Sequence, residues 1–228
     1  MMKVANSIPK TSQPSVAEFR EVFEKYINQG NQILYISGSS KSSGTYQSAV
    51  IASEGFENIH IIDSMSISFG CGMLVLEAAK MSKEGYDIET IKKKIEYLKD
   101  RVFVSMSVNS LEHLVKGGRI SNKKAFVANI LSIKPLLTVK DGLIYQEGQI
   151  RGKKNIIPSI LNQTKKVCGT DFSDKTVVIG CGDNLEEREL LKELVIKELN
   201  PKEIIEITIS PCMCSHSGPG FIGLTCFK

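Results

Sequence analysis

The first hundred residues alternate between short apolar runs and longer amphipathic segments. The apolar runs at residues 32–37 and 59–63 have the length of buried strands, and each leads through small residues into a segment with helical spacing. Ser15, with Glu18 three residues later, forms a capping box that predicts the start of a helix ending near Gly30. Further helices are predicted at residues 45–53, after the small residues 64–72 and through residue 83, and at 87–100. This alternation indicates a parallel sheet with crossover helices.

From residue 101 onward the pattern becomes a mixture of strands and helices. Asp141-Gly142 separates apolar runs at 135–140 and 143–150, and Asp-Gly in this setting is a strong signal for a hairpin turn. Other strands are predicted at 101–107, 175–181 and 203–209, with a terminal apolar run at 221–227. Helices are predicted at 110–116, 121–131, 153–166 and 184–199. We therefore expect an α/β fold of two domains, a parallel three-layer α/β/α domain at residues 1–100 and a mixed-sheet α/β domain at residues 101–228.

The amino-acid composition indicates an ordinary globular protein. Hydrophobic residues make up 42% of the 228 residues and charged residues 24%, which is typical of globular domains. No apolar run approaches the roughly 20 residues that span a bilayer, and the first residues lack a signal-peptide core, so a cytoplasmic location is predicted. The net charge of +4 comes from lysines scattered among acidic residues, without the interleaved aromatics that stack on bases. Nucleic acid is therefore not an expected partner. The six cysteines are too few for a disulfide scaffold and are expected to be reduced.

Three polar segments, at residues 11–15, 42–48 and 215–220, carry hydroxyls or an imidazole beside small residues or a helix start. Such groups can bind an anion together with the free amides of a helix N-terminus. Other interpretations stay open for each candidate: Thr11 in a turn before a proline, Ser43 as a helix N-cap, and His216 in a structural role. The residues alone predict an unassigned anion site.

Several familiar chemistries fit the sequence poorly. Five residues separate Gly38 from Gly44 and a threonine follows, whereas a phosphate-binding loop needs four and a lysine. Cys212-x-Cys214 near His216 lacks the spacing of a zinc site, so no metal is expected. A hydrolase built on Ser43 and His216 would need an acid partner that no motif identifies.

The order of the motifs carries more information than any one of them. In chain order they cover residues 11–15, 43–49, 62–64, 114–121, 133–137, 141–142, 151–152 and 216–220. This ordered set resembles the DegV family of fatty-acid-binding proteins from residue 9 to the end of the sequence.

The resemblance implies a fatty acid bound between two domains, with residues 101–228 forming the lipid-binding domain. It assigns the carboxylate to Thr11, to Ser43 with Gly44, and to His216 with Ser217. The implied ligand is a long-chain fatty acid such as palmitate, stearate or oleate. No cofactor, catalytic residue or membrane span is implied, and membrane contact is at most transient.

The resemblance also implies a partner. The protein would be the lipid carrier of a bacterial fatty-acid kinase system, in which a separate kinase phosphorylates the bound carboxylate. Arg119 and Arg151 match family arginines that would dock the kinase or contact the developing acyl phosphate.

Two departures from the family leave alternatives open. Family members normally carry roughly 50 to 60 further residues before the segment at 11–15, including a strand whose loss would expose sheet edges. The domain at 1–100 is then truncated, and the chain could be an inactive family member. Ser215-His216-Ser217 replaces the more usual Ala-His-Thr and keeps the hydroxyl. The enzyme alternative is a serine-dependent acyl hydrolase using Ser43 and His216.

Overall fold

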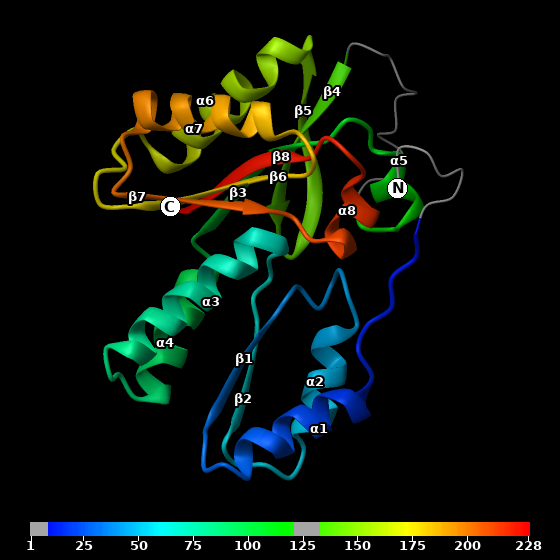
Figure 1. Cartoon of the computed structure of the whole chain (residues 1–228), viewed down its shortest axis with the longest axis vertical. Coiled ribbons are helices and arrows are strands. Elements are labelled where there is room, and N and C mark those ends of the chain that lie inside the picture. The colour runs from blue at the N-terminus through cyan, green and yellow to red at the C-terminus, as the bar shows by residue number, and fades with distance from the viewer. Residues whose placement is uncertain (1–8, 121–132) are drawn as a thin grey trace. The chain divides into compact units, whose positions relative to one another are not determined.

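A computed structural model describes residues 9–120 and 133–228 (Figure 1). Its contacts cluster into two compact units. The N-terminal unit consists of Ser12–Arg101 together with the hairpin turn Asp141–Leu143. The described residues of the C-terminal unit are 9–11, 102–120, 133–140 and 144–228.

The N-terminal unit is built from two parallel strands and four helices. Its elements are α1 (Val16–Ile27), β1 (Ile33–Ser37), α2 (Thr45–Ser53), β2 (Ile59–Asp63), α3 (Ser68–Lys83) and α4 (Ile88–Lys99). The strands pair in parallel, with Ile33 opposite Ile59. The predicted capping box is present at the start of α1, where the Glu18 amide donates to Ser15 Oγ at 3.2 Å and the Ser15 amide donates to Glu18 Oε2 at 2.7 Å. The predicted parallel arrangement is confirmed.

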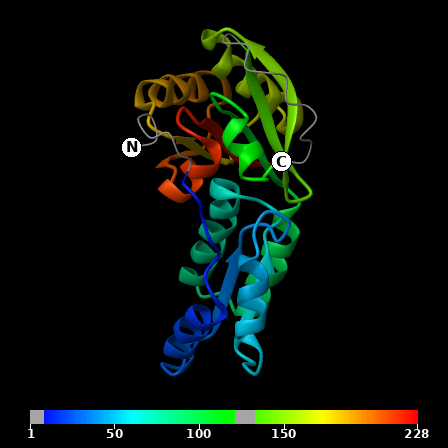
Figure 2. The same cartoon turned by 90° about the vertical axis from the view of Figure 1, so that its right-hand side faces the viewer.

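The core of this unit joins α1 and α2 to the strands. Phe23 of α1 is buried with Ala49 and Ala52 of α2, whose small side chains let the helices approach closely. The Phe19 ring meets the Tyr35 ring edge-on, with their centroids 5.1 Å apart. On the other side of β1, α3 and α4 lie side by side (Figure 2). A cavity of about 600 Å³ is lined by β1, α3 and the start of α4.

The C-terminal unit contains a six-stranded mixed sheet among its described residues, in the order β5-β4-β3-β8-β6-β7. The strands are β3 (Val102–Ser107), β4 (Ile133–Lys140), β5 (Leu143–Arg151), β6 (Thr176–Cys181), β7 (Glu203–Thr208) and β8 (Ile222–Phe227). β6 and β7 are parallel, whereas β8 is antiparallel to both β3 and β6. The strand nearest the end of the sequence therefore lies inside the sheet.

Two long helices cover one face of this sheet (Figure 1). The helices of the unit are α5 (Glu112–Lys116), the 3₁₀ turn η2 (Lys153–Asn155), α6 (Ile156–Cys168), α7 (Leu185–Leu199) and α8 (Pro211–Ser217). Leu161 of α6 and Leu191 of α7 are fully buried with Ile179 and Leu224 of the sheet in one apolar cluster. The short helices α5 and α8 contact each other.

The fold class predicted from the sequence is confirmed, and so is the hairpin. Asp141 and Gly142 form its turn with φ of 47° and 76°, the left-handed values that Asp-Gly favours in tight hairpins. Helix α3 begins at Ser68 and not after Gly72, because burial of Phe69 outweighs the low helix propensity of the glycines. Helix α8 was not predicted. The predicted helix at 121–131 lies outside the described residues.

Candidate functional site

Helix α8 places a histidine next to the segment at residues 9–11. The Ser210 hydroxyl accepts a hydrogen bond from the Met213 amide at 3.3 Å, and Pro211 occupies the first turn, both common at helix starts. His216 lies in the last turn, and its Nε2 is 2.8 Å from Thr11 Oγ1. This contact joins residues 205 positions apart in the sequence. Two of the predicted site residues are therefore hydrogen-bonded to each other in the C-terminal unit.

The His216 ring packs against the backbone of Gly117. A Cβ atom at Gly117 would lie 2.8 Å from His216 Nδ1, closer than real contacts allow, so this position requires a glycine. Nδ1 is buried and has no hydrogen-bond partner among the described residues. Nε2 is therefore the ring nitrogen that hydrogen-bonds to Thr11. When Nε2 carries the proton and donates it to Thr11 Oγ1, the threonine hydroxyl can donate its own proton to another acceptor.

The electrostatic environment keeps this imidazole neutral. Burial lowers the pKa of His216, and the positive charge of Arg119 lowers it further. The Arg119 guanidinium itself donates to the Gly117 carbonyl. A hydroxyl that is oriented by a neutral histidine can donate a hydrogen bond to a carboxylate without forming a permanent ion pair.

A second histidine, His113 of α5, packs in the reciprocal way. A Cβ atom at Gly218 would lie 2.7 Å from His113 Cδ2, and Gly218 also has a φ of 73°. His216 of α8 thus packs against Gly117 at the end of α5, and His113 of α5 packs against Gly218 at the end of α8. His113 was absent from the predicted site, because a lone histidine in an amphipathic segment carries no signal for such packing.

In the N-terminal unit, the structure places Ser43 and Gly44 just before α2. Gly44 is the N-cap residue, so the N-cap interpretation of Ser43 is wrong. The Ser43 hydroxyl accepts a hydrogen bond from the Thr45 amide at 3.2 Å and lies 2.8 Å from Thr45 Oγ1. A side chain at Gly44 would collide with Gln13, whose Nε2 donates to Ser48 Oγ at 2.9 Å. Gln13 thus couples the first polar motif to the second, a role that the sequence did not reveal.

The remaining predicted residues have local partners. The Ser217 hydroxyl donates to the Gly218 carbonyl at 3.1 Å. Arg151 ends β5, and its carbonyl accepts from Asn155 Nδ2 at 2.7 Å. Ser42, next to Ser43, donates from its hydroxyl to the Gly142 carbonyl at 2.8 Å, which holds the hairpin turn against this loop.

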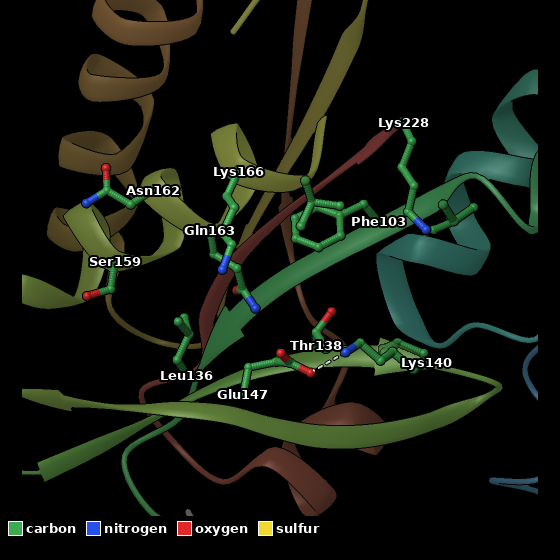
Figure 3. A pocket seen from close by; sticks show the side chains of 13 residues that line it. Phe103, Leu136, Thr138, Lys140, Glu147, Ser159, Asn162, Gln163, Lys166 and Lys228 are labelled. Carbon is green, nitrogen blue, oxygen red and sulfur yellow. Dashed lines mark ion pairs between the residues drawn. The ribbon is translucent and has the colours of Figure 1, made fainter. Parts of the chain in front are cut away.

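A separate cavity of about 510 Å³ lies between α6 and strands β3 to β5 of the C-terminal unit (Figure 3). Its apolar lining comes from Val102, Phe103, Leu136, Val139 and Val167. Its polar lining comes from Thr138, Lys140, Glu147, Ser159, Asn162, Gln163, Lys166 and Lys228. Lys140 and Glu147 form an ion pair across its edge. The cavity shares no lining residue with the Thr11–His216 pair.

Other kinds of site find no support in the described part of the chain. Residues 9–120 and 133–228 contain no group of three or more histidine, cysteine, aspartate or glutamate side chains that could hold a metal ion. Within the same ranges, no helix has the length and apolarity needed to cross a bilayer.

A family model and the related sequences that match this chain agree on one family. The family model described as an uncharacterised protein of the DegV family matches residues 1–228. A DegV domain-containing protein of Clostridium perfringens is 34% identical over 224 residues, which cover 95% of this chain and 77% of the relative.

Solved structures show the same fold. A DegV family protein from Thermus thermophilus, described as binding fatty acid, is 31% identical with a TM-score of 0.90, covering 97% of this chain and 80% of that one. A stearic acid-binding protein from Eubacterium ventriosum is 27% identical with a TM-score of 0.91, covering 99% and 80%. The family match spans the whole sequence and the structural likeness nearly all of it, so this chain belongs to the DegV family.

Proposed function

We propose that this protein binds a long-chain fatty acid and holds its carboxylate with Thr11 and His216, together with Ser43, Gly44 and Ser217. The observation that carries the proposal is the 2.8 Å contact between Thr11 Oγ1 and His216 Nε2. Two polar side chains from distant parts of the sequence meet there, and the His216 ring packs against Gly117. Structural relatives that are described as binding fatty acids support the choice of ligand.

The head group is recognised by neutral donors. The lowered pKa of His216 favours the uncharged imidazole, which orients the Thr11 hydroxyl through their hydrogen bond and leaves that hydroxyl to donate to the ligand. Hydrogen bonds to a charged acceptor contribute about 1.5–3 kcal/mol each. The carboxylate is oriented by these bonds and remains an anion with reactive oxygens.

Affinity comes from the acyl chain. Each buried methylene contributes about 0.8 kcal/mol, so a long chain contributes more than the polar contacts to its head. Specificity for a carboxylate and affinity for a hydrocarbon are thus supplied by different parts of the protein.

The bound fatty acid is the substrate of a separate enzyme. A kinase phosphorylates the bound carboxylate to an acyl phosphate, and this protein supplies no catalytic base. Arg119, beside the His216 ring, and Arg151, at the end of β5, are proposed to dock the kinase or to contact the developing acyl phosphate. Their positive charges suit a partner that carries nucleotide phosphates.

The test of binding is denaturing extraction of the purified protein followed by mass spectrometry for fatty acids. The expected result is nearly one fatty acid per chain in the wild type and a clear loss in Thr11→Ala and Ser43→Ala. Ser173→Ala is the matched control, because its exposed hydroxyl donates to Asp171, two residues away in a turn of the C-terminal unit. A wild type that carries no fatty acid and takes up none when it is added would refute the proposal.

The test of the kinase partner is acyl phosphate formation from the loaded carrier, a fatty-acid kinase and ATP. Arg119→Ala and Arg151→Ala should lower the rate while leaving the amount of extracted fatty acid unchanged. A loss of bound fatty acid in these variants would instead assign the arginines to the binding site.

A further inference from the structure

Two buried sulfur atoms meet in the C-terminal unit, away from the proposed carboxylate site. Cys168 ends α6 and Cys226 lies in β8, 58 positions later. Their sulfur atoms are 3.6 Å apart, and Cys226 is fully buried while Cys168 is 9% exposed. Since a disulfide bond is about 2 Å long, small side-chain rotations would bring the sulfurs to bonding distance.

The surroundings make the two thiols unequal. Cys226 donates its hydrogen bond to the Cys168 sulfur, which lowers the pKa of Cys168 and raises that of Cys226. The positive charges of Lys175 and Lys228 lower the pKa of Cys168 further. Lys175 is held in place because its ammonium donates to the Cys168 carbonyl at 3.1 Å. Cys168 is therefore the member of the pair that can react as a thiolate.

A cavity lies beside the residues that flank this pair, although neither cysteine lines it. The cavity of Figure 3 is lined by Lys166 and Val167, the two residues before Cys168. It is also lined by Phe103, which lies opposite Cys226 in the pairing of β3 with β8, and by Lys228. Its volume of about 510 Å³ admits a small peroxide with its hydration water.

We propose that Cys168 and Cys226 form a thiol pair that reacts with hydroperoxides and closes to a disulfide. The Cys168 thiol first releases its proton; the thiolate attacks one oxygen of the peroxide, the O–O bond breaks, and the departing oxygen takes up that proton to leave as water or an alcohol. The resulting Cys168 sulfenic acid is then attacked by the Cys226 sulfur. The S–S bond forms, and the hydroxyl leaves as a second water with the Cys226 proton. Overall, two thiols are oxidised and one hydroperoxide is reduced.

The other cysteines provide internal controls. Burial raises the pKa of Cys71, Cys181 and Cys214, which makes them poor nucleophiles. Cys212 is exposed and reports non-selective oxidation of an accessible thiol. The proposed pair should therefore react by virtue of its sulfur–sulfur contact and not because of exposure.

The test is graded treatment of the folded protein with hydrogen peroxide, followed by alkylation, digestion and mass spectrometry without reduction. We expect a peptide linked through Cys168 and Cys226 before Cys181 or Cys214 is modified. In Cys226→Ser the intermediate should persist, so a sulfenic acid reagent should label Cys168. Cys181→Ser, which removes a buried thiol from β6, should form the linked peptide as the wild type does.

Two controls separate the proposal from incidental oxidation. In urea, where the contact is lost, the linked peptide should form more slowly than in the folded protein. The proposal is wrong if Cys168 and Cys226 of the folded wild type are both still reduced, and therefore fully alkylated afterwards, at a peroxide dose that has already oxidised Cys212. Because that readout uses the wild-type protein, it holds even if a cysteine variant fails to fold.

Discussion

Two glycines set how closely the imidazoles of the C-terminal unit approach the backbone. Gly117 accommodates His216, and Gly218 accommodates His113. Gly117 has a φ of −73°, a value that any residue adopts, so its importance lies in the space it leaves and not in backbone conformation. Substitution there tests the site geometry with little backbone strain.

We expect Gly117→Ala to displace the His216 ring from Thr11, because the added Cβ would lie 2.8 Å from Nδ1 and 3.0 Å from the His113 carbonyl. Overpacking of this kind costs about 1–3 kcal/mol of stability. Extraction and mass spectrometry should show less bound fatty acid. Gly72→Ala, in α3 with open space around its Cβ position, should keep its ligand and a stable fold. Full retention of fatty acid in Gly117→Ala would count against His216 as a binding residue.

The lowered pKa of His216 predicts a pH dependence of stability. Between the folded value and the ordinary value of 6.5, the unfolded chain binds a proton at this residue and the folded chain does not. The contribution of His216 to the free energy of unfolding should therefore be fully present above about pH 6.5 and decrease as the pH falls below that value. Urea unfolding at a series of pH values should show this fall in the wild type and a shallower one in His216→Gln. Equal slopes would assign the dependence to other groups.

At the scale of elements, helix α8 depends on its N-cap more than a long helix would. It has seven residues, and His216 lies in its last turn. Replacing an N-cap serine with alanine typically costs about 1 kcal/mol. We expect Ser210→Ala to loosen α8 and lower the amount of bound fatty acid. Ser15→Ala, which removes the cap of α1 in the other unit, is the matched control and should lower thermal stability without releasing the ligand.

Most elements could be predicted because their signals are local. The capping box at Ser15 and the Asp141-Gly142 turn specify their own backbone geometry. The start of α3 was misplaced because its glycines lower helix propensity, and only the tertiary burial of Phe69 and Met73 compensates. Helix α8 carried Ser210 and a following proline, a recognisable start, but its short apolar segment gave no helical period.

The site could be predicted only in part, because its contacts are non-local. Polar composition marked the segments that hold Thr11, Ser43 and His216, and the family resemblance supplied the ligand. No periodicity could show that Thr11 meets His216 across 205 positions. Gln13 and His113 were missed because each packs against a glycine of a distant segment, a contact that appears only once the backbone approach is known.

At the scale of the whole molecule, β8 holds the C-terminal sheet together. Leu224 is fully buried between Ser105 of β3 and Ile179 of β6. We expect Leu224→Ala to cost about 2–5 kcal/mol, measured as a lower midpoint of urea unfolding. Leu185→Ala, at a side chain that is 53% exposed, should change stability by less than about 0.5 kcal/mol. Similar effects of the two substitutions would mean that β8 does not anchor the sheet.

The central position of β8 also bears on how the protein is made. A ribosome completes β3 and β6 long before it reaches β8, the strand that joins them. The nascent chain must therefore leave one edge of β3 and one edge of β6 unpaired until β8 has been synthesised. Thr11 also emerges before His216, so a translation product interrupted between them contains the first half of the head-group pair without the second. Such fragments would expose unpaired strand edges, which makes them substrates for chaperones and proteases.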